Sequence, residues 1–356
     1  MKLTKIFSIV AAAAMLLVGC NKTTITSTSE ITLTANSVVE VNTPITFVVT
    51  NAEGEDVSSD ATIYDKSHDF AQVSNPFTPT EDDDYTFYAV VGDFISNDLK
   101  ITVTPKVPTL PEDSDVANTS FVHHILLVDH TGNHCGYCPN MMKALKEVAE
   151  TGDYHSKYYE AMAHSYNSSD PAYSGAAAAI SGHYGVSDYP TLNYNFAYPT
   201  SSSYNAEHIK SQIDALWKES ADAGIAAATS MATKSVVVNA EVKAAVAGEY
   251  SVTAWLLEDD IFGEQTNGKE DWMDIHNNAI RQAAMTTPIS GYELGTIEVG
   301  KTAQQVLNLK IVKTEWNRDN MKVMVIASRK GDNNKMDVVN VVVCDINDTV
   351  SYNYNK

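Results

Sequence analysis

The stretch ILLVDHTGNHCGYCP, residues 125–139, decides how the rest of the chain is interpreted. Residues 126–129, Leu-Leu-Val-Asp, form a short apolar run typical of a buried strand, and the spacing of apolar residues after Pro139 predicts an amphipathic helix. Two thiols at the spacing of Cys135 and Cys138 can close a small, reversible disulfide. At a helix N-terminus, unpaired backbone N–H groups and the helix dipole would stabilise a Cys135 thiolate, and Cys138 would resolve its mixed disulfides. Thiol–disulfide chemistry is therefore the leading hypothesis.

A single CxxC pair also occurs in zinc sites and in inert structural disulfides. Zinc would need two further ligands, and no second CxxC or CxxH pair is present, although His123, His124, His130 and His134 lie close by. The sequence therefore predicts no metal and no other cofactor, with zinc as a minor alternative. His134, directly before Cys135, is placed to stabilise the thiolate as an imidazolium or to exchange protons near neutral pH. An exposed histidine without such a role is the alternative interpretation.

A second segment, residues 184–192 with the sequence YGVSDYPTL, follows the strand, the motif and the helix. In this order the segments resemble the thioredoxin family. The resemblance implies that the bond before Pro190 is cis, and that this backbone lies beside the motif and offers an edge to an extended substrate peptide. It also implies that Asp129 is a buried acid that takes a proton from the resolving thiol. A solvated aspartate at the end of a strand is the alternative for Asp129.

The N-terminus predicts export and lipidation. Residues 1–5 form a basic head, and Ile6 to Val18 is an apolar run too short for a membrane span, so residues 1–19 are interpreted as a signal peptide. Residues 17–20, Leu-Val-Gly-Cys, match a bacterial lipobox, in which Cys20 becomes the acylated (palmitate-type) N-terminus of the mature lipoprotein. Two or more acyl chains give stable membrane anchoring. No acidic cluster follows Cys20, which favours a periplasm-facing outer-membrane anchor, with the cell surface as the alternative.

The net charge of the chain bears on its binding partners, and the position of Cys344 bears on its redox chemistry. The formal net charge is -21, so nucleic acid is excluded as a partner on electrostatic grounds. Cys344 follows directly on the apolar run Val338 to Val343, and this position predicts a buried, inert thiol in a strand. Cys344 is therefore not expected to act as a third redox-active cysteine beside Cys135 and Cys138.

Six segments follow from composition and pattern along the 356 residues. We expect a signal peptide (1–19), a lipidated tether (20–29), an immunoglobulin-like β-sandwich (30–104), a proline-containing linker (105–120), a thioredoxin-like domain (121–222) and a C-terminal β-sandwich domain (223–356). The expected fold class is thus multidomain α/β plus all-β, with a thioredoxin-like α/β domain flanked by an N-terminal immunoglobulin-like β-sandwich and a C-terminal β-sandwich.

The whole architecture resembles the thioredoxin-like outer-membrane lipoproteins related to the 28-kDa outer-membrane protein of Bacteroides-type bacteria. The resemblance rests on the lipobox, on residues 131–139, on Tyr189-Pro190 and on the crossover His276-Asn277-Asn278-Ala279-Ile280-Arg281. It implies a surface or adhesin-like protein more than a particular activity. The crossover itself is interpreted as a packed connection in which His276 and Arg281 bond backbone carbonyls.

Two classes of function remain. The first is a membrane-anchored thiol–disulfide oxidoreductase or isomerase that acts on the thiols or disulfides of exported proteins, together with a redox partner protein. Its catalytic residues would be Cys135, Cys138, Pro190, Asp129 and His134. The alternative is a non-catalytic surface or adhesin-like lipoprotein in which the disulfide is structural, because a fold alone does not choose between chemistries.

Overall fold

The computed structural model describes residues 30–196, 200–284, 289 and 291–356. The predicted signal peptide, the lipidation site Cys20 and the tether lie outside the described residues. The chain divides into two compact units, the first made of Met1–Ala35, Thr46–Pro76 and Thr86–Lys100 and the second of Asn36–Ile45, Phe77–Tyr85 and Ile101–Lys356. Within the described ranges, no helix is both long enough and apolar enough to cross a membrane.

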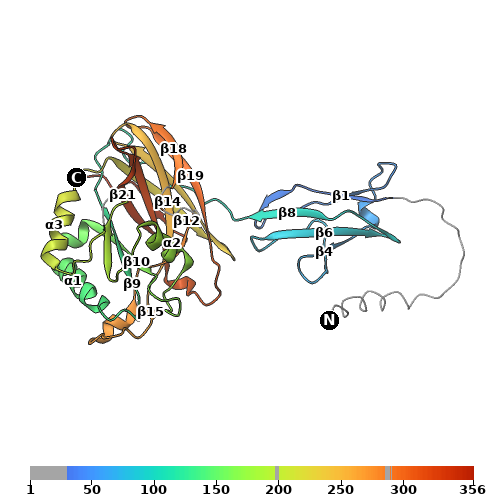
Figure 1. Ribbon diagram of the computed structural model, residues 1–356. Helices are drawn as coiled ribbons and strands as arrows, with labels where there is room; N and C mark the ends of the chain where they lie inside the picture. Colours follow the sequence, from blue (N-terminus) through green and yellow to red (C-terminus); the bar gives the residue numbers. More distant parts are fainter. Residues whose placement is uncertain (1–29, 197–199, 285–288, 290) are drawn as a thin grey trace, which may run out of the picture. The chain divides into compact units, whose positions relative to one another are not determined.

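The strands of the first hundred residues form two small sheets (Figure 1). In the smaller sheet, β1 (Thr32–Thr34) pairs antiparallel with β3 (Val48–Thr50). The larger sheet has the order β2-β8-β6-β4-β5, with β7 paired to β6. Its strands are β2 (Val38–Glu40), β4 (Thr62–Asp65), β5 (Ala71–Val73), β6 (Asp84–Val91), β7 (Phe94–Ile95) and β8 (Leu99–Thr104). Every second residue along β6 is buried, as expected for a strand with one face on a core.

An eight-stranded mixed sheet dominates the second unit, with the order β11-β9-β10-β17-β14-β20-β21 and β18 paired to β14. Its strands are β9 (Ile125–Thr131), β10 (Tyr158–His164), β11 (Thr191–Tyr194), β14 (Gly248–Glu258), β17 (Ala279–Ala283), β18 (Tyr292–Ile297), β20 (Met321–Lys330) and β21 (Met336–Asp345). The pairs β9/β10 and β10/β17 are parallel, and the others are antiparallel. One sheet therefore joins the motif-bearing segment to the C-terminal strands.

Three α-helices among the described residues cover the β9 end of this sheet: α1 (Cys138–Glu150), α2 (Gly175–His183) and α3 (Ala206–Leu216). Successive side chains of a strand point to opposite faces. Ile125 and Leu127 accordingly pack with α1 and α3, whereas Leu126 and Val128 pack with α2 on the other face. Proline in the first turn suits the start of α1, because its missing N–H would have no helical partner there.

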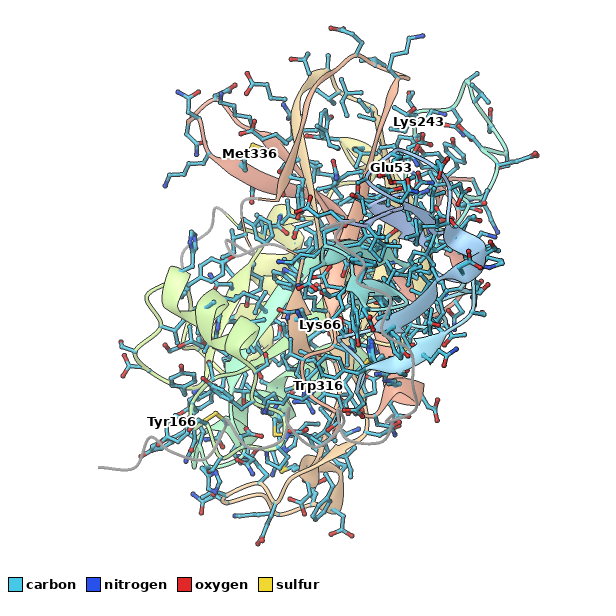
Figure 2. All side chains as sticks on the ribbon, turned by 90° about the vertical axis from the view of Figure 1, so that its right-hand side faces the viewer. Glu53, Lys66, Tyr166, Lys243, Trp316 and Met336 are labelled. Carbon is cyan, nitrogen blue, oxygen red and sulfur yellow. A yellow bond between two sulfur atoms is a disulfide. The ribbon has the colours of Figure 1, made fainter. Side chains whose placement is uncertain are left out.

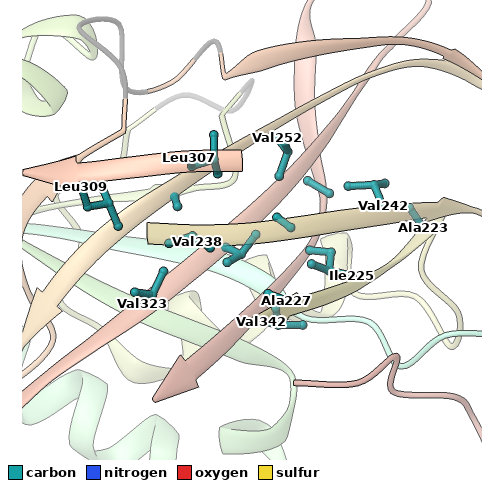
Figure 3. Packing of buried hydrophobic residues seen from close by; sticks show 14 of the residues in the cluster. Ala223, Ile225, Ala227, Val238, Val242, Val252, Leu307, Leu309, Val323 and Val342 are labelled. Atoms are coloured by element: carbon teal, nitrogen blue, oxygen red, sulfur yellow. The ribbon is translucent and has the colours of Figure 1, made fainter. Parts of the chain in front are cut away.

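A second sheet, with the order β19-β13-β12-β22, packs on the C-terminal half of the large sheet. It is made of β12 (Ala223–Met231), β13 (Ser235–Ala244), β19 (Thr302–Lys310) and β22 (Thr349–Val350). Figure 3 shows the aliphatic side chains between the sheets, among them Val238, Leu307 and Val323. Each side chain buried in this way contributes about 1.5–3 kcal/mol.

Short elements complete the described chain. The hairpin strands β15 (Ile261–Phe262) and β16 (Ile275–His276) pair antiparallel. The 3-10 helices are η1 (Ser58–Asp60), η2 (Tyr154–Ser156), η3 (Asp271–Asp274) and η4 (Arg318–Asn320).

The predicted fold class is wrong. Strands predominate in the described chain, and no thioredoxin-like α/β domain stands between two separate sandwiches. The physical reason is the crossover strand β17, which pairs with β10 on one side and with β14 on the other. It makes the short strands β9 to β11 the edge of a sheet whose longest strands are C-terminal.

Candidate functional site

The candidate site is the loop between β9 and α1, which carries the CGYC motif. Cys135 and Cys138 form a disulfide with a Cα–Cα distance of 5.4 Å, so the predicted close pair is confirmed. Cys138 is the first residue of α1, and its backbone N–H donates to Cys135 Sγ at 3.2 Å. Both cysteines are buried: 2% of Cys135 and 0% of Cys138 are exposed.

A second segment, residues 263–268 between β15 and β16, lies on this loop, and we call it the cover loop. Gln265 Nε2 donates to the Cys135 carbonyl at 3.0 Å, and Asn267 Nδ2 donates to the Gly136 carbonyl at 3.1 Å. The Thr266 N–H donates to the carbonyl of Asn133 at 2.7 Å. A Cβ at Gly136 would lie 2.8 Å from Asn267 Nδ2, so the contact is close enough to require glycine or a shifted amide. The cover loop is therefore hydrogen-bonded to the backbone of the loop that carries the disulfide.

Buried polar groups hold both loops in place. His164 Nδ1 donates to Asp170 Oδ2 at 2.8 Å with both side chains fully buried, and the same oxygen accepts the Asn133 N–H at 2.8 Å. Burial alone would raise the pKa of Asp170, but the hydrogen bonds and the charge of His164 outweigh it and lower that pKa to about 2. His276 Nε2 donates to the Gly263 carbonyl at 2.9 Å, which anchors the start of the cover loop. Burial, with His164 nearby, lowers the pKa of His276 to about 4, so it is neutral at pH 7.

Asp129 lies beneath the helix that the motif begins. Its side chain is fully buried, on the same face of β9 as Ile125 and Leu127, so the solvated alternative is wrong. Neither carboxylate oxygen has a hydrogen-bond partner among the described residues. Burial first, and then the charge of Glu160 on β10, raise the pKa of Asp129 well above its usual range. Burial thus favours the protonated form of this acid under α1.

Pro190 and His134 differ in burial and in their position relative to the motif. The Tyr189–Pro190 bond is cis, as the resemblance implied. Pro190 is buried directly before β11, whose first residue pairs with His130, so it lies at the end of β9 from which the motif loop continues. Tyr166, labelled in Figure 2, packs edge to face on Tyr189 with a centroid distance of 5.3 Å. His134 is exposed. The catalytic roles of Pro190, His134 and Asp129 stay predictions.

The crossover behaves as expected, since His276 and Arg281 bond backbone carbonyls. Arg281 Nη1 donates to the carbonyl of Pro171 at 2.9 Å, and its Nε donates to Glu258 Oε2 at 2.7 Å. Cys344 is a buried free thiol in β21, as predicted, and burial raises its pKa to about 11. Across the described ranges, no group of three or more histidines, cysteines and acids is arranged to hold a metal.

Sequence reasoning missed the cover loop and Glu160. The only local sign of the cover loop is the turn sequence Gln265-Thr266-Asn267-Gly268, which predicts a turn but not what it contacts. Glu160 is half-buried, and its position between apolar residues in a short strand pattern is a detectable sign of an acid next to the core.

Comparison with known proteins gives one family match. Residues 177–350, just under half of the chain, match the family described as outer membrane protein Omp28. The chain is therefore related to that family, and the match supports an outer-membrane location. The matched range includes Pro190 and the crossover but neither Cys135 nor Cys138. No curated protein matches the chain in sequence.

Solved structures add information on the fold alone. HBP35 of Porphyromonas gingivalis is 14% identical, with a TM-score of 0.53 over 67% of this chain and 79% of that chain. A putative membrane-anchored protein from Corynebacterium diphtheriae is 11% identical over 92% of this chain and 59% of that chain, and its TM-score of 0.21 is too low to support any inference.

Proposed function

We propose that this chain is a lipoprotein anchored to the outer membrane through Cys20, and that it serves as a binding protein, surface or adhesin-like, rather than as an enzyme. In this proposal Cys135–Cys138 is a structural disulfide. The observation that carries it is the burial of both cysteines in a loop whose backbone is hydrogen-bonded to the cover loop. Exchange with a protein disulfide requires a sulfur that an incoming thiolate can reach.

The disulfide then has a mechanical role. It ties the loop after β9 to the first residue of α1, while Gln265 and Asn267 tie the same loop to the β15–β16 hairpin. The N-terminus of α1 and the crossover region are thereby held together as one frame. A frame of this kind suits a protein that presents a rigid surface.

The test compares reactivity of the bridge in the folded and unfolded chain. We expect glutathione to reduce the bridge only after denaturation, a reduction potential below about -300 mV, and insulin reduction no faster than in buffer. The matched control is Gln265→Ala combined with Asn267→Ala, which removes two hydrogen bonds of the cover loop and should speed up reduction. Rapid reduction of the folded native chain, with insulin reduction that Cys135→Ser abolishes, would overturn the structural assignment.

Anchoring is tested separately. Labelled palmitate should enter the protein in cells and should be lost in Cys20→Ala, and protease added to intact cells should cleave the chain if it serves as a surface protein. Labelling of Cys20→Ala at the native level would contradict the anchor, and a chain left uncut in intact cells would face the periplasm and contradict the surface role.

A second candidate, thiol–disulfide exchange with exported proteins, is favoured by one observation: Asp129 is fully buried, its pKa is raised, and its carboxylate has no hydrogen-bond partner among the described residues. In this candidate a substrate thiolate attacks Cys135 Sγ, the bond to Cys138 breaks, and the Cys138 thiolate takes the proton of Asp129. The second substrate thiol then displaces Cys135, so the substrate is oxidised and the pair is reduced, and a disulfide-bearing partner protein reoxidises it. Slower turnover in Asp129→Asn, with a shifted pH profile, is the result that this candidate requires.

A further inference from the structure

A cavity of about 500 Å³ opens beside α1, away from the disulfide loop. Its apolar walls come from three parts of the second unit: Met142, Leu145 and Ala149 on α1, Met162 on β10, and Trp272 of η3 with Ile275 of β16. These side chains make most of the wall apolar. A cavity of this size accommodates a small organic molecule.

One carboxylate lines this cavity, that of Glu160 on β10. No described residue donates a hydrogen bond to it. Lys322 lowers the pKa of Glu160 through its charge without a hydrogen bond to it. The ammonium group of Lys322 is instead paired with Asp259, at 2.6 Å from Oδ2. Lys146, which also lines the cavity, forms an ion pair with Glu150 and lies over the Trp272 ring, 5.8 Å from its centroid. The Glu160 carboxylate is thus an acceptor that the protein leaves open toward the cavity.

Asp129 is fully buried on the neighbouring strand β9, and its carboxylate has no hydrogen-bond partner among the described residues. Burial and the charge of Glu160 raise the pKa of Asp129, so Glu160 is the acid that supplies negative charge at the cavity. Burial raises the pKa of Glu160 to about 7, so its charge is costly where it lies. A cation in the cavity would relieve that cost, whereas an anion would increase it.

We propose that this cavity binds a small organic cation with an apolar body, such as an arylalkylamine, with its ammonium group on the Glu160 carboxylate and its body between α1 and Trp272. Charge-assisted hydrogen bonds to a carboxylate are stronger than neutral ones. The net charge of -21 favours cations over anions near the protein. The inference rests on the proposed binding function and names the ligand class that this site would take.

The experiment is calorimetric titration of the full mature chain with 2-phenylethylamine at pH 8 and low salt. The neutral probe 2-phenylethanol, in which a hydroxyl replaces the amine, should bind at least about tenfold more weakly, because it lacks the charge-assisted contact. Glu160→Gln keeps the shape and removes the charge, so it should weaken amine binding about tenfold or more and leave 2-phenylethanol unchanged. Glu147→Gln, on the exposed side of α1, is the matched control and should bind as the native chain does.

A second variant tests the role of the cavity without changing any charge. Ala149→Phe should fill the cavity and abolish binding of both probes, with thermal unfolding checking that it folds. Equal binding of amine and alcohol, unchanged binding in Glu160→Gln, or no binding of either probe by the native chain would overturn the proposal. These results differ from failure of the proposed function, which would appear as a reactive disulfide with amine binding intact.

Discussion

The buried ion pair between Arg281 and Glu258 supports a prediction of defined size. Only 3% of the Arg281 side chain and 5% of the Glu258 side chain are exposed, with Nε 2.7 Å from Oε2. Arg281 also donates to the carbonyl of Pro171 and lies over the ring of Trp316, labelled in Figure 2. The guanidinium donates to Glu258 Oε2, and the one further hydrogen bond that the described residues make to this carboxylate is from the Asn317 N–H to Oε1 at 2.9 Å.

We expect Arg281→Met to lower the free energy of unfolding by about 3–5 kcal/mol, because it leaves a buried carboxylate without its counter-charge. Glu258→Gln added to Arg281→Met should restore about 2 kcal/mol or more of that loss, since the remaining amide costs less to bury than a charge. The assay is urea unfolding followed by tryptophan fluorescence. All four tryptophans lie in the second unit, so the signal reports that unit.

The control for this prediction is Lys313→Met, which breaks an exposed pair with Glu315 at 3.8 Å. An exposed pair contributes at most about 1 kcal/mol, so this variant should unfold close to the native chain. A cost below about 1 kcal/mol for Arg281→Met, or a double variant that is less stable than the single one, would refute the reasoning from an uncompensated charge.

Three further predictions concern the disulfide, a buried acid and the core. Replacing Cys135 and Cys138 by serine should lower the free energy of unfolding by about 2 kcal/mol, the loop-closure entropy of a four-residue ring; an unchanged urea midpoint would contradict this. Glu160→Gln should stabilise the chain by about 2–3 kcal/mol at pH 8 and little at pH 5. The pKa of Glu160 is raised from 4.5 to about 7 in the folded state, so the native chain loses free energy of unfolding as pH rises from 4.5 through 7. Equal effects of Glu160→Gln at pH 5 and pH 8 would contradict a raised pKa. Val323→Ala, fully buried between the sheets, should cost about 1–3 kcal/mol in the same assay, against almost nothing for the exposed Val299→Ala, and equal costs would contradict the assigned core.

Local sequence pattern predicted the elements around the motif well. The apolar run 126–129 lies in β9, and the spacing of apolar residues after Pro139 predicted α1. The apolar run Val338 to Val343 lies in β21. Each of these signals is a periodicity within a few turns of helix or a few residues of strand, which the chain carries regardless of its partners.

Other elements carry no such signal. Strand β12 contains Ala223, Ala226, Ala227 and Ala228, and alanine is depleted in strands, so its sequence did not indicate one. It forms a strand because it pairs with β13 along its whole length and its small side chains fit between the packed sheets. Tertiary context here overrides intrinsic propensity.

The sequence by itself determined the chemistry that is present: the CGYC pair, the proline before β11, the buried Cys344 and the backbone-bonding roles of His276 and Arg281. Only the tertiary structure decided that the motif segment joins a large β-rich sheet, that residues 263–268 contact the motif loop, and that Asp129 and Glu160 lie on neighbouring strands. Each of these depends on contacts between segments far apart in the chain, such as the pairing of β10 with β17. Their free energy arises from packing and burial in the folded state, which periodicity over a short window does not encode.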